Sequence, residues 1–236
     1  MTTPLYYQDA YLREFDAEVV GHAADGAVIL DRTAFYPGGG GQPHDLGTLS
    51  AAGQTWPVER LKKDGPAILH YVQGDPPPVG TRVHGVLDWE RRYALMRTHT
   101  ALHCLCGTIW NVYGAQVTGG AMEPGQARMD FEFESMRQEF VREIEAKVNA
   151  EVAQARAVSS RSLPREEAFA IPDLIRTKIN LLPAGISEVR VVEIDGLDLQ
   201  ADGGTHVANT REIGVIRIVG YESKGKINKR LRIALE

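Results

Sequence analysis

Two histidines four residues apart, His99 and His103, place the strongest constraint on what this chain can fold into. If their segment is helical, both imidazoles leave the same face, with about 6 Å between Cβ atoms, which is close enough to bind one metal ion. A second segment, Asp202-Gly203-Gly204-Thr205-His206, follows about a hundred residues later. Its two glycines suit a tight loop that brings Asp202 and His206 to one point. The pair alone arises often by chance, but together the two segments require a fold that brings them into contact.

Composition narrows the class of protein. The 236 residues are 43% hydrophobic and 24% charged, which is ordinary for a globular protein of one large or two small domains. No apolar run approaches the ~18 residues of a membrane span, and the N-terminus lacks the features of a signal peptide. Cys104 and Cys106, two apart on a predicted helix, point in different directions, so we expect free thiols and a cytoplasmic protein. The net charge of −5 argues against an indiscriminately basic nucleic-acid binder.

The first 87 residues predict a small β-barrel. Asp-Gly pairs at 25–26 and 64–65 each separate two short alternating segments, a pattern typical of type I′ hairpins. Ala52-Gly53 is expected to turn the chain between two further strands, and a last strand is predicted at 82–87. Several short strands joined by tight turns favour a barrel.

The second half, residues 88–236, predicts helices packed on an antiparallel sheet, so the whole chain is expected to be α+β. Asp88 suits the N-cap of a helix that runs to about Val112. Ser135 to Gln138 is typical of a capping box that opens a second helix, and Pro164 suits the first turn of a short third one. Strands are predicted at 189–194, 215–221 and 226–235.

The paired segments predict a metal site. Zinc favours imidazole, thiolate and carboxylate ligands, and His99, His103 and His206 offer three nitrogens while Asp202 offers an oxygen. A single histidine on an apolar helical stripe is more often a core residue than a ligand, but the pair and the second segment favour binding. Cys106, near the same helical face, is an alternative ligand, although its place in the apolar stripe favours core packing.

Three motifs together resemble a known family. They are His99-Thr-Ala-Leu-His103, Gly203-Gly-Thr-His-Val-Ala-Asn-Thr-Arg-Glu-Ile-Gly214, and Thr33-Ala-Phe-Tyr-Pro-Gly-Gly-Gly-Gly-Gln-Pro43 with Asp45 and Gly47 after it. The chain resembles the editing domain of alanyl-tRNA synthetase and the freestanding alanyl-tRNA editing proteins called AlaX. The glycine-rich segment is typical of the alanyl branch and not of the threonyl-tRNA synthetase editing domain. The resemblance covers nearly the whole chain, with no aminoacylation domain, as in the medium-length AlaX type.

The resemblance implies a zinc-dependent hydrolase that removes serine, and possibly glycine as a second error, from mischarged tRNA(Ala). Zinc is expected at His99, His103 and His206, with Asp202 at a position where many members have cysteine. A carboxylate is a harder ligand than a thiolate, so Asp202 is either the fourth ligand, which we favour, or a general base. Whether the metal activates water or holds the substrate stays open. Neither a membrane nor an obligate protein partner is implied.

Selectivity needs a group that detects the serine hydroxyl, because a pocket that hydrogen-bonds a hydroxyl can discriminate by as much as ~10⁴-fold. The resemblance places such a contact at Thr33, for which an ordinary strand threonine is the alternative, and adds Thr205 beside His206. The loop residues Gly39, Gly40, Gly41 and Gln42 are expected to approach the substrate or tRNA. They lack the Gly-Lys-Ser/Thr ending of a nucleotide P-loop.

A basic stretch near the C-terminus is the candidate phosphate-binding surface. It contains Lys224, Lys226, Lys229, Arg230 and Arg232, to which Arg91, Arg92 and Arg97 could add. Such contacts would position RNA without reading its bases, and a solvated basic hairpin is the alternative. Two other functions also fit the motifs: a metallohydrolase of another ester or amide, and a tRNA-binding module with a structural zinc.

Overall fold

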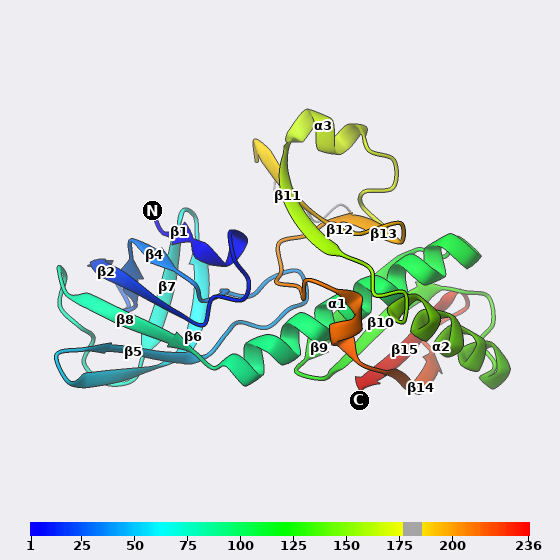
Figure 1. The fold of residues 1–236 in the computed structure, drawn as a ribbon, viewed down its shortest axis with the longest axis horizontal. Coiled ribbons are helices and arrows are strands. Elements are labelled where there is room, and N and C mark those ends of the chain that lie inside the picture. Colours follow the sequence, from blue (N-terminus) through cyan, green and yellow to red (C-terminus); the bar gives the residue numbers. More distant parts are fainter. Residues whose placement is uncertain (177–185) are drawn as a thin grey trace. The chain divides into compact units, whose positions relative to one another are not determined.

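The computed structural model describes residues 1–176 and 186–236. The chain divides into two compact units, Met1–Leu95 and Met96–Glu236, and helix α1 (Trp89–Tyr113) contains the boundary between them (Figure 1). The predicted α+β class is confirmed, since a closed antiparallel barrel and further antiparallel sheets accompany a few helices. The predicted split between residues 87 and 88, which assigns all of this helix to the second part, stays a prediction.

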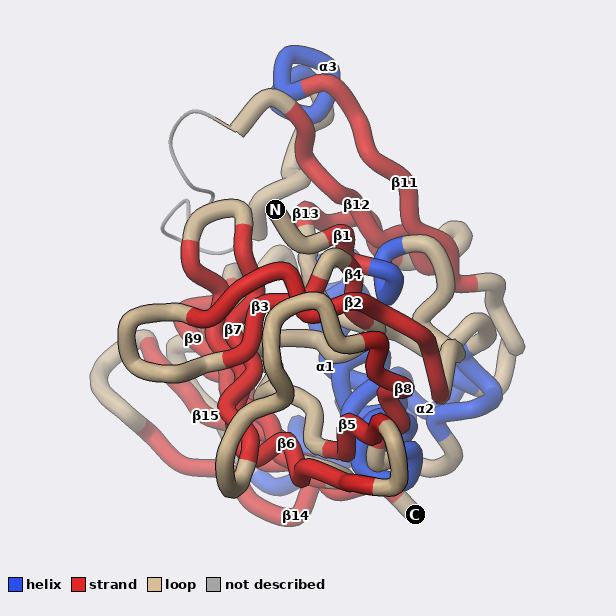
Figure 2. Tube along the Cα trace, turned by 90° about the vertical axis from the view of Figure 1, so that its left-hand side faces the viewer, coloured by secondary structure: helices blue, strands red, loops and turns tan. Residues whose placement is uncertain are grey.

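The first unit is a six-stranded barrel in the order β2-β3-β7-β6-β5-β8, with every neighbouring pair antiparallel (Figure 2). Its alternating sequence creates the core: on β2, Phe15, Ala17 and Val19 are buried, while the residues between them are exposed. The strands are β2 (Glu14–His22), β3 (Val28–Leu30), β5 (Gly47–Ala51), β6 (Gln54–Asp64), β7 (Ala67–Val72) and β8 (Arg82–Leu87), and β1 (Thr3–Pro4), η1 (Leu5–Tyr7) and β4 (Arg32–Thr33) lie outside the barrel order.

The hairpins of the barrel lie where the sequence predicts them, but the predicted type I′ geometry of the Asp-Gly turns is wrong. At Asp25-Gly26 only the glycine has a positive φ, and Gly26 N donates to Ala23 O, which is a type I turn followed by a left-handed glycine. At Gly65 the next residue is Pro66, whose ring excludes the positive φ that a second type I′ position requires. The type I′ pattern occurs instead at Ala52-Gly53, with φ of 48° and 81°.

The second unit contains two sheets. A four-stranded antiparallel sheet has the order β14-β15-β10-β9, and a three-stranded one has the order β11-β12-β13 (Figure 1). The elements are β9 (Val117–Glu123), β10 (Gln126–Glu132), α2 (Gln138–Val152), β11 (Val158–Pro164), α3 (Arg165–Ala170), β12 (Glu188–Ile194), β13 (Asp198–Ala201), η2 (Thr210–Ile213), β14 (Ile216–Ser223) and β15 (Asn228–Leu235). Strands β9, β10, β11 and β13 of this unit are absent from the sequence-based expectations.

Helix α2 packs on the edge strand β14, and two of its polar side chains hydrogen-bond the backbone of that strand. Asn149 Nδ2 donates to Ile216 O (2.8 Å) while its Oδ1 accepts from Ile216 N (2.9 Å), and Glu145 accepts from Ile218 N (2.6 Å). These bonds occupy backbone groups that an edge strand otherwise offers to another chain. The predicted capping box is wrong, since α2 begins at Gln138 with Arg137 at its N-cap.

Helix α1 has the predicted N-cap. Arg91 N donates to the Asp88 carboxylate (3.1 Å) at its start. Cys104 and Cys106 on this helix are buried free thiols, as expected. Among the described residues, no helix has both the length and the apolar character that crossing a membrane demands.

Candidate metal centre

The two histidine-bearing segments meet in the second unit. His99, His103, Asp202 and His206 each offer a ligand atom, and these atoms all lie within 4.8 Å of one another. Asp202 is central, with Oδ2 at 2.9 Å from His206 Nε2 and Oδ1 at 3.5 Å from His99 Nε2. Three imidazoles and one carboxylate at this spacing are a donor set that fits zinc.

One face of α1 holds the loop that carries the second half of the site. Gly107 and Asn111 follow His99 and His103 at intervals of four residues. A Cβ on Gly107 would lie 2.9 Å from Leu197 O, so only glycine lets the chain before β13 approach this closely. Asn111 Nδ2 donates to the same carbonyl (2.9 Å). Helix α1 thus contacts the segment that begins at Leu197 in two places: at His99 and His103, and one to two helical turns further along, at Gly107 and Asn111.

The Asp202–His206 loop has its own supports. Gly204 N donates to Asp202 Oδ2 (2.7 Å), which closes a tight turn, and Arg190 Nη1 donates to the carbonyls of Asp202 and Gly204 (both 3.0 Å). Thr205 is fully buried. The glycine pair therefore forms the compact loop that the sequence predicts.

Both ring nitrogens of His206 have a partner at hydrogen-bond distance. Thr100 Oγ1 donates to Met96 O (2.9 Å), accepts from Val207 N (3.2 Å), and lies 3.3 Å from His206 Nδ1. Because the Thr100 proton is already used and an ionised Asp202 only accepts, both ring nitrogens of His206 face acceptors, and a neutral ring can donate to one of them at a time. Thr100 lies inside the histidine motif, yet its role is invisible without the fold.

A second carboxylate, missed by the sequence analysis, binds His103. Asp198 Oδ2 lies 2.8 Å from His103 Nδ1 and accepts from Gln200 Nε2 (2.7 Å). Its Oδ1 forms an ion pair with Arg176 Nη1 at 2.7 Å, out of hydrogen-bond alignment. One signal could have found it: Asp198 and Gln200 alternate just before Asp202, so in an extended segment the three side chains share a face.

Burial and neighbouring charges set the ionisation of the site. Burial lowers the pKa of His206 to about 4 and that of His99 well below its usual value, so both are neutral near pH 7, the form that can bind a metal. Burial also acts to raise the pKa of Asp202, but the neighbouring His99 and the His206 hydrogen bond outweigh it and hold this pKa well below its usual range. For His103, the Asp198 hydrogen bond outweighs burial and raises the pKa.

The glycine-rich loop lies in the first unit. Gly38 to Gly41 have φ of 87°, 134°, 60° and 89°, which four consecutive residues with a Cβ would not adopt. Gly39 and Gln42 exchange backbone hydrogen bonds of 3.0 Å. Gly39, Gly40 and Gly41 are exposed, whereas the predicted contact residue Gln42 is buried.

Two buried charges support this loop. Arg92 and Asp45, both fully buried, form a close ion pair, and Arg92 also donates to Ala34 O and to Ala10 O. Asp45 accepts from Tyr36 N (2.6 Å). Arg92 is therefore a structural residue, since its donors are bound inside the barrel unit.

Thr33 is fully buried, with its hydroxyl 2.9 Å from His70 Nε2 and accepting from Phe35 N (3.2 Å). His70 Nδ1 lies 3.2 Å from Val28 O and therefore carries the ring proton. The Thr33 hydroxyl must then donate to Nε2, which leaves its oxygen available only as an acceptor.

The predicted phosphate-binding cations are largely paired within the chain. Arg97 donates to Ile213 O (2.6 Å), and buried Lys229 donates to Gly225 O and Lys226 O. The other pairs are Arg230 with Asp130 (2.7 Å), Arg232 with Glu222 (2.7 Å) and Lys224 with Glu222 (3.2 Å). Lys226 and Lys224 are the exposed lysines of the hairpin.

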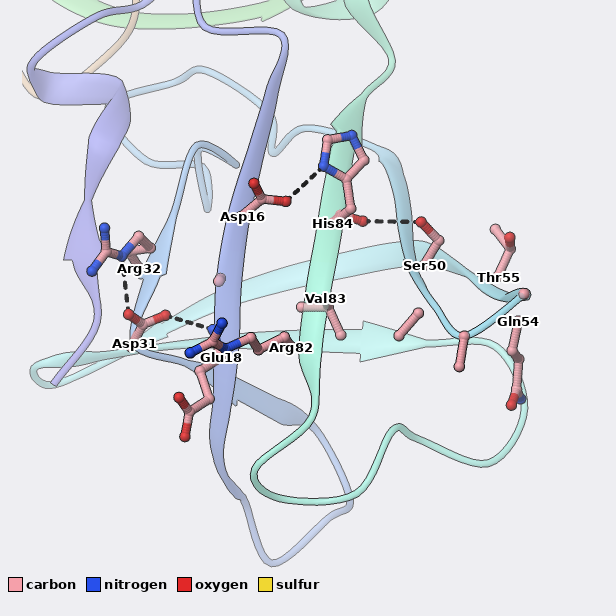
Figure 3. Close-up of a pocket in the computed structure, with 14 residues that line it drawn as sticks. Asp16, Glu18, Asp31, Arg32, Ser50, Gln54, Thr55, Arg82, Val83 and His84 are labelled. Carbon is pink, nitrogen blue, oxygen red and sulfur yellow. Dashed lines mark hydrogen bonds and ion pairs between the residues drawn. The ribbon is translucent and has the colours of Figure 1, made fainter.

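An open cleft of about 730 Å³ lies on the barrel surface, lined in part by Asp16, Asp31 and His84 (Figure 3). His84 Nδ1 lies 2.9 Å from Asp16, and Arg32 pairs with Asp31 at 2.9 Å. The residues that line it include none of the predicted site residues in the described part of the chain.

Comparison with known proteins identifies the class of protein to which this chain is similar. Residues 189–232 match the second additional domain of threonyl and alanyl tRNA synthetases, and residues 9–91 match the class II (A) tRNA synthetases. Both matches place the chain among relatives of the synthetases that charge tRNA.

The chain belongs to the alanyl-tRNA editing protein AlaX-M family, as the sequence motifs predict. The AlaX-M of Saccharolobus solfataricus is 41% identical over 98% of this chain and 98% of its own length, and that of Methanosarcina barkeri is 38% identical over 100% and 99%. An alanine–tRNA ligase of Pyrobaculum arsenaticum is 41% identical over 94% of this chain, which corresponds to 25% of the ligase.

Proposed function

We propose that this protein is a trans-editing hydrolase that deacylates tRNA(Ala) mischarged with serine, with glycine as a second substrate, at a zinc site. The convergence of His99, His103, Asp202 and His206 within 4.8 Å is the observation that carries the proposal. Family membership supports the substrate class, because the full-length relatives are named alanyl-tRNA editing proteins. The glycine-motif domain is assigned to residues 1–87 and the deacylase domain to residues 88–236.

The chain's own residues support zinc binding through three imidazole nitrogens and the Asp202 carboxylate. Bound zinc would supply a Lewis acid for the ester carbonyl or for the attacking water. Asp202 fits the role of ligand better than that of general base, because a carboxyl group whose pKa is held well below its usual range accepts protons weakly. In the reaction, the water oxygen bonds to the ester carbonyl carbon, the bond from that carbon to the ribose oxygen breaks, and a proton of the water ends on the ribose oxygen, which releases the free amino acid and the tRNA.

Thr33 supports selectivity for serine. The Thr33 hydroxyl already donates its hydrogen bond to His70, so the Thr33 oxygen can only accept another one. A serine hydroxyl can donate that hydrogen bond. Alanine lacks this donor, so the Thr33 oxygen would then keep only the hydrogen bond that it accepts from Phe35 N. Thr205 is proposed as a catalytic or selectivity residue on the resemblance alone.

For tRNA binding, exposed Gly39, Gly40 and Gly41 allow close backbone approach, with buried Gln42 fixing the loop. In the hairpin, exposed Lys224 and Lys226 suit phosphate contacts. Lys229 and Arg230 support this hairpin from within, since their donors bind the chain itself, whereas Arg97 binds Ile213 O and is kept as a candidate tRNA contact on the resemblance alone.

The test measures release of serine from seryl-tRNA(Ala) beside release of alanine from alanyl-tRNA(Ala), with bound zinc quantified in each protein. We expect the wild type to release serine and spare alanine, and His103→Ala to lose zinc and activity together. His84→Ala, on the exposed barrel surface, is the matched control and should keep both. Thr33→Ser retains the hydroxyl and should keep serine release, whereas Thr33→Val should lose it.

The rival functions predict other results from the same assay. A zinc-loaded, folded wild type that binds tRNA without releasing serine would favour a tRNA-binding module with structural zinc. Faster cleavage of simple esters than of aminoacyl-tRNA would favour a metallohydrolase of another substrate. Either outcome would reject the editing proposal.

A further inference from the structure

We infer that Asp198 is a positioning residue of the metal centre that selects which nitrogen of His103 faces the metal. This inference rests on the proposed function for the presence of a metal, but it concerns a residue outside the ligand set. Asp198 is 4% exposed and lies 2.8 Å from His103 Nδ1. The contact joins β13 to α1 behind the site.

The chemistry of this contact fixes the tautomer of His103. An ionised carboxylate is an acceptor only, so His103 Nδ1 must carry a proton to bond with it. Nε2 then holds the free lone pair, and it is the nitrogen left to face Asp202 and the other two imidazoles. The opposite tautomer, with its proton on Nε2, offers no lone pair to a metal there.

Asp198 is held so that it can serve only this purpose. Arg176 lies 2.7 Å from Oδ1 and balances its charge, while Gln200 donates to Oδ2 beside the His103 contact. Oδ2 is hydrogen-bonded to Gln200 and His103 and Oδ1 lies beside the Arg176 cation, so these contacts hold the carboxylate against His103 Nδ1. Its function is therefore to orient His103.

The backbone geometry supports the same conclusion independently. A Cβ on Gly107 would lie 3.0 Å from the Asp198 Cβ as well as 2.9 Å from Leu197 O. Asn111 binds that same Leu197 carbonyl. The helix that carries His103 thus has an open position at Gly107, one turn further along, which admits Asp198 to its face.

The first test compares zinc affinity of the wild type and Asp198→Asn by competition with a chromophoric chelator, without tRNA. The amide either turns its NH₂ towards His103 Nδ1, which forces the wrong tautomer, or turns it towards the Arg176 cation. We expect zinc affinity to fall about 10- to 100-fold, and the absorption spectrum of the Co²⁺-loaded protein to change. Asp195→Asn, three residues away and exposed, is the matched control and should bind as the wild type does.

The second test needs no variant and keeps the inference testable if Asp198→Asn fails to fold. Long-range ¹H–¹⁵N NMR correlations of the wild-type histidines should show His103 protonated at Nδ1 with and without zinc. An unprotonated Nδ1, or unchanged zinc affinity in a folded Asp198→Asn, would overturn the role of Asp198. Neither measurement involves deacylation, so a wild type that binds zinc but releases no serine would reject the editing function alone.

Discussion

At the scale of single residues, His70 couples the barrel to pH. It is fully buried, and burial lowers its pKa to about 4, below the ordinary 6.5. As pH falls from 6.5 towards 4, His70 binds a proton in the unfolded chain but stays neutral in the folded barrel. The free energy of unfolding therefore falls, by about 3 kcal/mol for a pKa shift of this size. Above pH 6.5 this contribution to pH dependence disappears.

We expect His70→Asn, which keeps a donor for Val28 O, to lose this part of the pH dependence. Denaturant unfolding at several pH values should show wild-type stability falling relative to the variant by about 1.4 kcal/mol per pH unit between pH 6 and 4.5. The comparison cancels the other buried histidines, which both proteins share. Parallel pH profiles for the two proteins would contradict the assignment.

Sequence motifs predict the candidate ligands at this scale because residue type and spacing carry the chemistry. His99 and His103 need only a helix, and Asp202 and His206 need only a tight glycine loop. Asp198 and Thr100 escape prediction because their roles depend on which side chains meet across elements distant in sequence. The same limit applies to Lys229 and Arg97, whose charge suggests RNA but whose donors bind backbone carbonyls.

At the scale of elements, Asn149 on α2 protects the edge of β14. We expect Asn149→Leu to lower the free energy of unfolding by about 1–3 kcal/mol, because two backbone groups of Ile216 lose their partner. It should also promote self-association through the uncovered strand, as measured by sedimentation. Arg142→Leu, exposed on the same helix, controls for adding a leucine, and equal effects of the two variants would argue against edge protection.

Elements with a strong period or cap are predictable from this sequence, and the others are not. The strand at 82–87 and the helix that begins after Asp88 match the prediction closely. Strand β9 contains Gly119 and Gly120, and β11 is largely polar and exposed, so neither shows the alternation that identifies a strand. Ser135 matches a capping box by type alone, and the helix begins further along the chain.

At the scale of the whole molecule, all four candidate ligands belong to the unit Met96–Glu236. Zinc should therefore stabilise this unit by binding its folded state. We expect hydrogen exchange to slow around His99–His103 and residues 202–206 when zinc is added, with the barrel strands of the first unit unchanged. Equal slowing of exchange in both units would contradict this. In His103→Ala, added zinc should not slow exchange in either unit.

The face of α1 that presents His99, His103, Gly107 and Asn111 determines where this chain can gain or lose residues. A single insertion between these positions would rotate everything beyond it by about 100°, and so separate a ligand from the glycine that admits Asp198. Between Asn111 and Leu197 the helices and strands also have to be kept, but the exposed connections between the described elements there can change in length. Engineered tags or linkers belong in that interval, at an exposed connection such as Glu134-Ser135 between β10 and α2, and never within the helix.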